Sequence, residues 1–182
     1  MLIGIAGIAA PIAIWRFGAA GQGAVVIGPW QTSLVTGGVD ADMYTRNYVA
    51  ITALLALNRN EAIYFEAQRD DDGRKLSASC NYDVTGGPIQ ARWWSITAYA
   101  DDNFLIPNAA NRFSYNVRSL GTAPDGYYSI ALGPRERPGN WLPTGNRGGG
   151  FNLLLRLYNP DTELAKSPDL AKLPSIKRAG EC

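Results

Sequence analysis

The sequence contains no histidine among its 182 residues. This absence excludes Ser-His-Asp and Cys-His nucleophile pairs, histidine-based zinc sites and an imidazole general base. Any catalysis by this chain would therefore have to use carboxylates, lysine, tyrosine, arginine or backbone groups. The sequence favours no enzyme class, so we set enzymatic activity behind binding as a hypothesis.

An excess of charge of either sign is also missing, because 17 basic residues stand against 16 acidic ones. A net charge of +1 gives no electrostatic reason to expect a nucleic acid as partner. Charged residues make up only 18% of the chain, whereas it holds 20 glycines and 11 prolines. This composition predicts one mainly β domain built from short strands and many turns.

Motifs for cofactors and metals are lacking as well. The glycines at positions 18, 21 and 23 do not have the spacing of a dinucleotide-binding loop. Asp70, Asp71 and Asp72 are contiguous before Gly73, whereas the ligands of a calcium loop alternate along the chain. Asp-Gly is instead typical of a tight turn. From the glycine spacing we predict no cofactor, and from the contiguous acids we predict no metal.

Residues 1–17 carry no charge before Arg16. The uncharged run is shorter than the ~20 residues that span a bilayer as a helix, and it lacks a basic leading region. It indicates a signal or membrane-anchor segment, with a buried N-terminal element as the alternative. Residues 18–39 then form a linker and an edge strand, and residues 40–182 form the β domain. This organisation predicts attachment to the membrane through residues 1–17, with the domain in the periplasm, or secretion.

One helix is predicted from Met43 to Ala56, with Asp40 or Asp42 as its N-cap. An apolar stripe at helical spacing should pack on the sheet and comprises Tyr44, Tyr48, Ile51 and Leu55.

Strands are predicted at 62–68, at 76–84 as its return strand, at 89–99 and at 151–158. Within the third of these, alternation puts Trp93, Ser95, Thr97 and Tyr99 on one face and Arg92, Trp94, Ile96 and Ala98 on the other. Because both faces carry a tryptophan, this strand should be central and covered on both sides.

An ordered series of motifs resembles the domain of unknown function 1214 family over roughly residues 40 to 178. The series comprises Arg92-Trp93-Trp94-Ser95-Ile96-Thr97, Asn108, Arg112, Asp125-Gly126, Asn140-Trp141-Leu142-Pro143, Phe151 and Leu155-Arg156-Leu157-Tyr158-Asn159-Pro160. The resemblance implies a jelly-roll-like β-sandwich with a helix upstream. It implies no established activity for the short members, and longer relatives carry an N-terminal domain of unknown function 1254.

Three arginines, Arg92, Arg112 and Arg156, lie in or beside predicted strands. A buried guanidinium needs an acceptor, so one interpretation is structural ion pairs with Asp101, Asp102 or Glu66. The other is that two of the arginines converge on an anionic ligand, because guanidinium matches carboxylate or phosphate in a bidentate manner.

Aromatic residues gather in the same motifs, and the loop containing Asn140 and Trp141 is long for a compact domain. Such residues serve either as core or as a platform on which a sugar ring stacks, and the candidates are Trp93, Trp94, Tyr99, Tyr127 and Trp141. A glycosidase-like pair would have to come from Glu61 and Glu66 or from Asp101 and Asp102. We therefore expect a binding or structural module of the cell envelope for a carbohydrate or a small anionic ligand. A carboxylate-based hydrolase and a subunit of an envelope assembly are the alternatives.

The sequence has two cysteines, Cys80 and Cys182. In an exported protein they can form a disulfide, whereas the alternative is a buried free Cys80 and a loose Cys182. Closing a loop of on the order of 100 residues adds about 4 to 5 kcal/mol on the chain-entropy model.

We expect no free thiol when the exported protein is denatured without reductant and titrated with a thiol reagent. Detection of two reactive thiols per chain would contradict the pairing.

Overall fold

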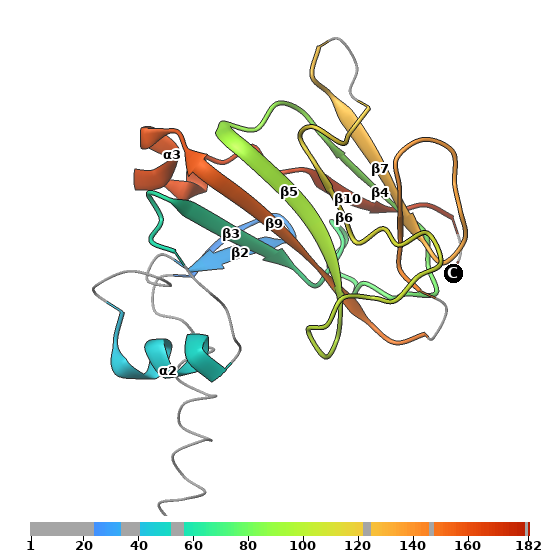
Figure 1. The fold of residues 1–182 in the computed structure, drawn as a ribbon, viewed down its shortest axis with the longest axis horizontal. Helices are drawn as coiled ribbons and strands as arrows, with labels where there is room; N and C mark the ends of the chain where they lie inside the picture. The colour runs from blue at the N-terminus through green and yellow to red at the C-terminus, as the bar shows by residue number, and fades with distance from the viewer. Residues whose placement is uncertain (1–23, 34–40, 52–56, 122–124, 146–147, 181) are drawn as a thin grey trace, which may run out of the picture.

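The computed structural model describes residues 24–33, 41–51, 57–121, 125–145, 148–180 and 182. In these residues the chain forms two β-sheets and short helices (Figure 1). The mainly β class is therefore confirmed, and the jelly-roll assignment stays a prediction. The segment 1–17 lies outside the described residues. No helix in the described part is long and apolar enough to cross a membrane.

The larger sheet has six strands, and each pairs with its neighbours in antiparallel fashion. In spatial order they are β1 (Ala24–Ile27), β2 (Trp30–Ser33), β3 (Ala62–Ala67), β9 (Phe151–Pro160), β5 (Ala91–Ala100) and β6 (Ser114–Asn116). Figure 1 shows β9 running diagonally between β3 and β5. The two longest strands, β5 and β9, therefore lie side by side inside this sheet.

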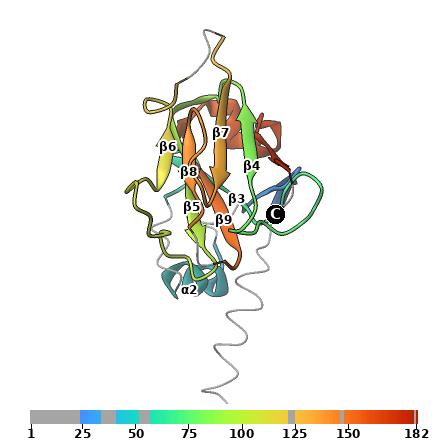
Figure 2. The ribbon, with the colours of Figure 1, turned by 90° about the vertical axis from the view of Figure 1, so that its right-hand side faces the viewer.

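The smaller sheet covers one face of the larger one, and in Figure 2 it lies toward the viewer. In spatial order its strands are β10 (Ser175–Arg178), β4 (Tyr82–Gly86), β7 (Tyr128–Gly133) and β8 (Trp141–Pro143). The pairing of β7 with β8 is parallel, and the other pairs are antiparallel.

The core lies between the sheets because strands of both present apolar side chains to the same interior. On β9, Leu153, Leu155 and Leu157 are fully buried, whereas the alternate residues are half-buried. Aromatic rings join the layers: Trp94 of β5 lies 4.8 Å from Tyr128 of β7, measured between ring centroids. The sandwich is held together by the inward-facing alternate residues of each strand.

The two faces predicted for β5 agree with the structure. Trp94, Ile96 and Ala98 enter the core, and the alternate residues lie on the outer face of the large sheet. Ser95 and Thr97, each only 5% exposed, show that this outer face is also covered at its centre.

The turn at Asp70–Gly73 forms as predicted, with Gly73 at φ +79° and its N–H donating to the carbonyl of Asp70. The predicted return strand over 76–84 is wrong. After this turn the chain crosses to the small sheet, where β4 begins only at Tyr82. Backbone groups of the crossing segment bond elsewhere: Ala78 donates its N–H to Gly149, and its carbonyl accepts from the Thr144 hydroxyl.

A disulfide joins Cys80 in this crossing segment to Cys182, with the Cα atoms 4.2 Å apart. The predicted pairing is therefore confirmed. It fixes the C-terminal segment after β10 to the segment that enters the small sheet.

The predicted helix is present as α2 (Met43–Ile51), and residues 52–56 of the expected range lie outside the described residues. Asp42 is its N-cap, because its side chain accepts hydrogen bonds from the backbone N–H groups of Tyr44 and Thr45 and from the Thr45 hydroxyl. These bonds, with the Thr45 hydroxyl first, lower the pKa of Asp42 below its ordinary value.

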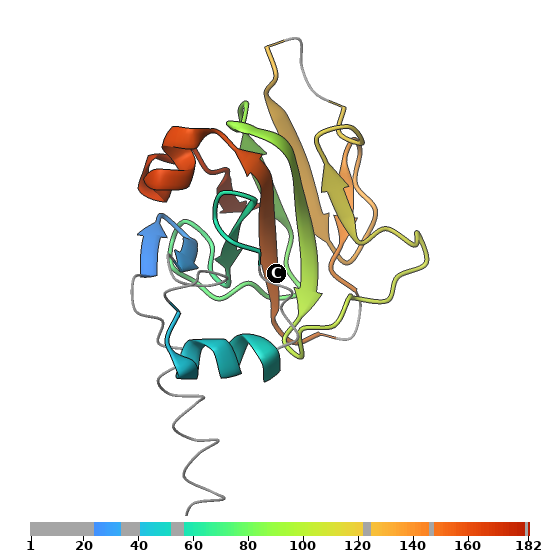
Figure 3. The same cartoon turned by 60° about the vertical axis from the view of Figure 1, so that its left-hand side comes forward.

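The stripe of α2 was expected to pack on the sheet, but Tyr44 is 41% exposed and Met43 67% exposed. Figures 1 and 3 show α2 near one end of the sandwich rather than across a sheet face. The side chains of Tyr48, Ile51 and Leu55 fall outside the described ones. Two further short helical elements, α3 (Thr162–Lys166) and the 3-10 turn η2 (Pro168–Leu170), follow β9 in the chain.

We expect Leu155→Ala to lower the free energy of unfolding by about 2 to 5 kcal/mol, because it removes a fully buried side chain between Phe65 and Ile96. The matched control is Leu154→Ala on the half-buried outer face, for which less than half of that loss is expected. Urea unfolding followed by circular dichroism measures both changes. Equal losses would contradict the assignment of the two faces.

Candidate functional site

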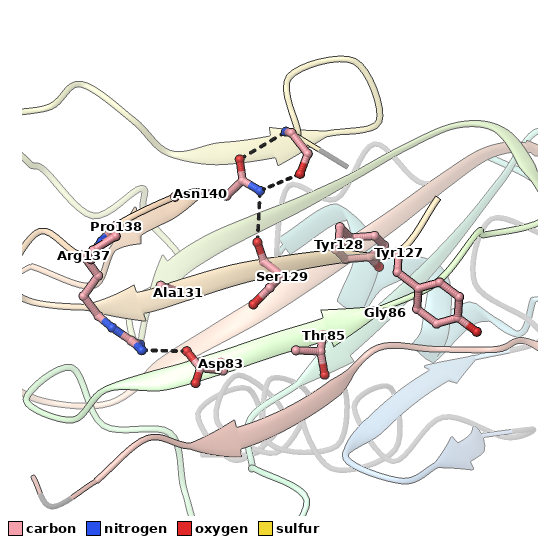
Figure 4. Close-up of a pocket in the computed structure, with 12 residues that line it drawn as sticks. Asp83, Thr85, Gly86, Tyr127, Tyr128, Ser129, Ala131, Arg137, Pro138 and Asn140 are labelled. Atoms are coloured by element: carbon pink, nitrogen blue, oxygen red, sulfur yellow. Dashed lines mark hydrogen bonds and ion pairs between the residues drawn. The ribbon is translucent and has the colours of Figure 1, made fainter. Parts of the chain in front are cut away.

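A groove of about 770 Å³ lies on the outer face of the small sheet, over β4 and β7 (Figure 4). Tyr82, Val84 and Ile130 of these strands point into the core. Strand alternation therefore turns Asp83, Thr85, Ser129 and Ala131 outward, where they line the groove. We call this site the β4–β7 groove.

One end of the groove carries a charged pair. Arg137 Nη2 lies 2.8 Å from Asp83 Oδ1, and Arg137 Nη1 donates to the backbone carbonyl of Tyr82 at 3.0 Å. The pair is only partly shielded from solvent, since its side chains are 29% and 41% exposed. A partly exposed ion pair contributes little to stability, and its carboxylate and guanidinium remain able to hydrogen-bond to hydroxyl groups.

The other end carries Tyr127, whose side chain is 60% exposed. Its ring lies against Gly87, where a Cβ atom would meet the ring carbons at 3.2 Å. The glycine lets the ring lie close to the backbone on one side, so that the ring offers its other side to solvent. An exposed aromatic ring beside polar groups is the arrangement that stacks on the C–H face of a sugar.

Tyr128 contributes a buried side to the groove. Its hydroxyl makes no hydrogen bond within the described part of the chain, and burial raises its pKa well above the ordinary value. Gly86 is required next to it, because a Cβ atom there would lie 2.6 Å from the hydroxyl oxygen. Because burial raises its pKa, the Tyr128 hydroxyl stays protonated.

Asn140 forms the rim and ties the loop to the sheet (Figure 4). Its amide nitrogen donates to the carbonyls of Ser129 and Gly121 at 3.0 and 3.1 Å, and its amide oxygen accepts from the Gly121 N–H at 3.2 Å. Asn140 thus lines the groove, and its side chain is largely engaged by backbone groups. Its position shapes the groove.

Trp141 and Arg112 lie near this rim and belong to one chain of contacts. The indole N–H of Trp141 donates to the carbonyl of Gly133, which fixes the loop to β7. Arg112 Nη1 donates to the Tyr115 hydroxyl at 2.6 Å, and that hydroxyl donates to the Trp141 carbonyl at 3.2 Å. The half-buried Trp141 therefore holds the long loop in place, and the Tyr115 hydroxyl, which also accepts from Arg112, connects β6 with β8.

The other two predicted arginines lie elsewhere. Arg156 is half-buried on the outer face of the large sheet, and Arg92 is exposed at the start of β5. The expected ion pairs with Asp101, Asp102 or Glu66 do not occur among the described residues, whose ion pairs involve Arg74, Arg137, Lys166 and Arg178. Asp101 instead accepts a hydrogen bond from the Gly150 N–H.

The aromatic residues also separate, because Trp94 is in the core, Trp93 and Tyr99 are on the large sheet, and Tyr127 and Trp141 are on the small one. Sequence reasoning missed Asp83 and Arg137. Alternation in Tyr82-Asp83-Val84-Thr85 was the available signal for Asp83. No pattern linked Arg137 to it, because the two lie on different elements.

No group of three or more Cys, Asp or Glu residues that could hold a metal ion occurs in the described ranges.

The fold and the groove define a mainly β sandwich with a shallow surface site that carries several polar side chains. The chain belongs to the DUF1214 family, described as a protein of unknown function, whose model matches residues 61–162. No curated protein matches the chain.

The solved structures similar to this chain include the following two. The VPA0106 protein from Vibrio parahaemolyticus is 26% identical with a TM-score of 0.63, and the match covers 75% of this chain and 35% of that one. An uncharacterised protein from Burkholderia cenocepacia is 20% identical with a TM-score of 0.42, over 65% of this chain and 29% of that one. This chain thus corresponds to about a third of the length of the Vibrio protein.

We expect Asn140→Asp to lower the free energy of unfolding by about 1 to 3 kcal/mol, because it removes both donors and faces two carbonyl oxygens with a carboxylate. The same substitution at Asn152, whose amide makes one 3.4 Å contact with Asn103, serves as the control. Thermal unfolding measures both variants. A loss no larger at position 140 than at position 152 would contradict the bridging role of Asn140.

Proposed function

We propose that this protein is a ligand-binding module of the cell envelope whose β4–β7 groove binds a carbohydrate or a similar polyhydroxylated compound. The observation that carries the proposal is the pairing of the exposed Tyr127 ring with polar side chains along the same groove. Ring stacking would hold the apolar face of a sugar, and the polar groups would bond its hydroxyls.

The polar groups suit hydroxyl ligands because they include donors and acceptors. Ser129 and Thr85 offer hydroxyls, Asp83 an acceptor and Arg137 donors. The guanidinium of Arg137 and the carboxylate of Asp83 form an ion pair, so this end of the groove carries no net charge. This balance favours a neutral polar ligand.

The chemistry of the groove favours binding over hydrolysis. Glycoside hydrolysis in its usual form needs two carboxyl groups about 5 to 10 Å apart. Among the residues that line the groove, Asp83 is the one acid. Asp101 and Asp102, one of the two acid pairs that the sequence suggested, do not line the groove. They accept hydrogen bonds from the backbone N–H groups of Gly150 and Phe104.

The disulfide supports a location in an oxidising compartment, because such bonds persist outside the cytosol. The uncharged segment 1–17 supports export or attachment to the membrane. We therefore propose that the domain functions in the periplasm or outside the cell.

We expect calorimetric titration with maltohexaose, cellohexaose or chitohexaose to show binding of at least one of them. Tyr127→Ala should weaken that binding about 10-fold, because the stacking ring is lost. The matched control is Phe104→Ala, which removes another strongly exposed aromatic side chain, 74% exposed, in the loop after β5.

Absence of binding for all three oligosaccharides would contradict the carbohydrate proposal. Equal weakening by the Tyr127 and Phe104 substitutions would contradict the placement of the site in the groove.

A further inference from the structure

The outer face of the large sheet carries a second unusual group of side chains, centred on Arg156. Cross-strand pairing places Arg156 between Tyr64 on β3 and Ser95 on β5. Its guanidinium donates from Nη1 to the Thr97 hydroxyl at 3.1 Å and from Nη2 to the Tyr99 hydroxyl at 2.6 Å. The guanidinium carbon also lies 5.5 Å from the centroid of the Tyr99 ring. Arg156 is therefore held in one orientation on this face.

Arg156 has no acidic partner in the described part of the chain, where every ion pair involves another basic residue. A guanidinium carries five N–H donors, and the two bonds to Thr97 and Tyr99 leave others available. A half-buried arginine is ordinarily balanced by an anion, because removing its charge from water is costly. Its charge is therefore complementary to an anionic group from outside the domain.

Aromatic side chains lie on both sides of Arg156 along this sheet face. Trp93 and Tyr158 are cross-strand partners in edge-to-face contact, with ring centroids 5.4 Å apart. They lie two residues along their strands from Ser95 and Arg156, which is about 7 Å away on the same face. On the β3 side, burial raises the pKa of Tyr64, while the charge of Arg156 acts in the opposite direction. The guanidinium of Arg156 reaches the opposite way, toward Thr97 and Tyr99, so the ring beside the cation is that of Tyr99.

We propose that this Arg156 face binds a small organic carboxylate with an aromatic or apolar body. The carboxylate would accept hydrogen bonds from the free N–H groups of Arg156, and its body would lie against the ring of Tyr99. The residues belong to β5 and β9 in the large sheet, whereas the β4–β7 groove lies on the opposite side of the sandwich. This second site is therefore independent of the proposed carbohydrate site.

Calorimetric titration of the whole protein with benzoate and with its neutral analogue benzamide tests the charge requirement. We expect benzoate to bind at least about 10-fold more tightly than benzamide, because charge-assisted hydrogen bonds are roughly twice as strong as neutral ones. Inorganic phosphate, which lacks the aromatic body, should also bind at least about 10-fold more weakly. Failure of benzoate to bind, or equal binding of benzoate with either control compound, would overturn the proposal.

Two substitutions test the residue. Arg156→Met removes the charge, and Arg156→Lys keeps it but removes the planar fork, so each should weaken benzoate binding at least about 10-fold. The control is Arg92→Met, which removes an exposed arginine of the same sheet and should leave binding unchanged. Unchanged binding in the Arg156→Lys protein, shown by circular dichroism to be folded, would overturn the role of the fork.

Tyr99→Phe separates a ligand role from a structural one. It removes the hydroxyl that accepts from Nη2, which releases one more donor for the ligand. We expect benzoate binding within about 3-fold of the unsubstituted protein, even where the melting temperature falls. A loss as large as that of Arg156→Met would show that the Arg156 effect is structural and would overturn the proposal. Oligosaccharide titrations should be unaffected by all of these substitutions.

Discussion

The position of β9 between β3 and β5 is the constraint on which the rest of the structure depends. Because a strand presents alternate residues to opposite sides, β9 supplies Leu153, Leu155 and Leu157 to the core and Arg156 and Tyr158 to the outer surface. Any slip of its register by one residue would exchange these two sets. The packing of the core therefore also fixes where the Arg156 guanidinium stands relative to the Tyr99 ring.

The small sheet depends on this arrangement through contacts that cross the sandwich. Phe151, the first residue of β9, packs its ring edge-to-face on Tyr82 of β4, with centroids 5.7 Å apart. Trp30 of β2 donates its indole N–H to the carbonyl of Pro174 just before β10. These contacts lie between strands that are far apart in the sequence, so the shape of the β4–β7 groove depends on the whole domain rather than on one hairpin.

How much the sequence predicts follows from which interactions are local. Period-two alternation separated Trp93 from Trp94 and gave the faces of β5, and the Asp42 cap and the Gly73 turn depend on neighbouring residues only. The return strand over 76–84 was wrong because the backbone partners of that segment, such as Gly149, lie far away in sequence. For the same reason the sequence could not show that Asp83 pairs with Arg137. It also could not show that Arg156 lies apart from Arg92 and Arg112.

The bond between Cys80 and Cys182 closes a covalent ring that contains every strand from β4 to β10. The main residues of both proposed binding surfaces belong to this ring. Cleavage of a single peptide bond within the ring would therefore not separate them from the rest of the protein. A protease that cleaves one loop in the ring would leave the two pieces attached through the sulfur atoms. While the disulfide stays oxidised, a severed strand is thus held close to the strands with which it must pair again.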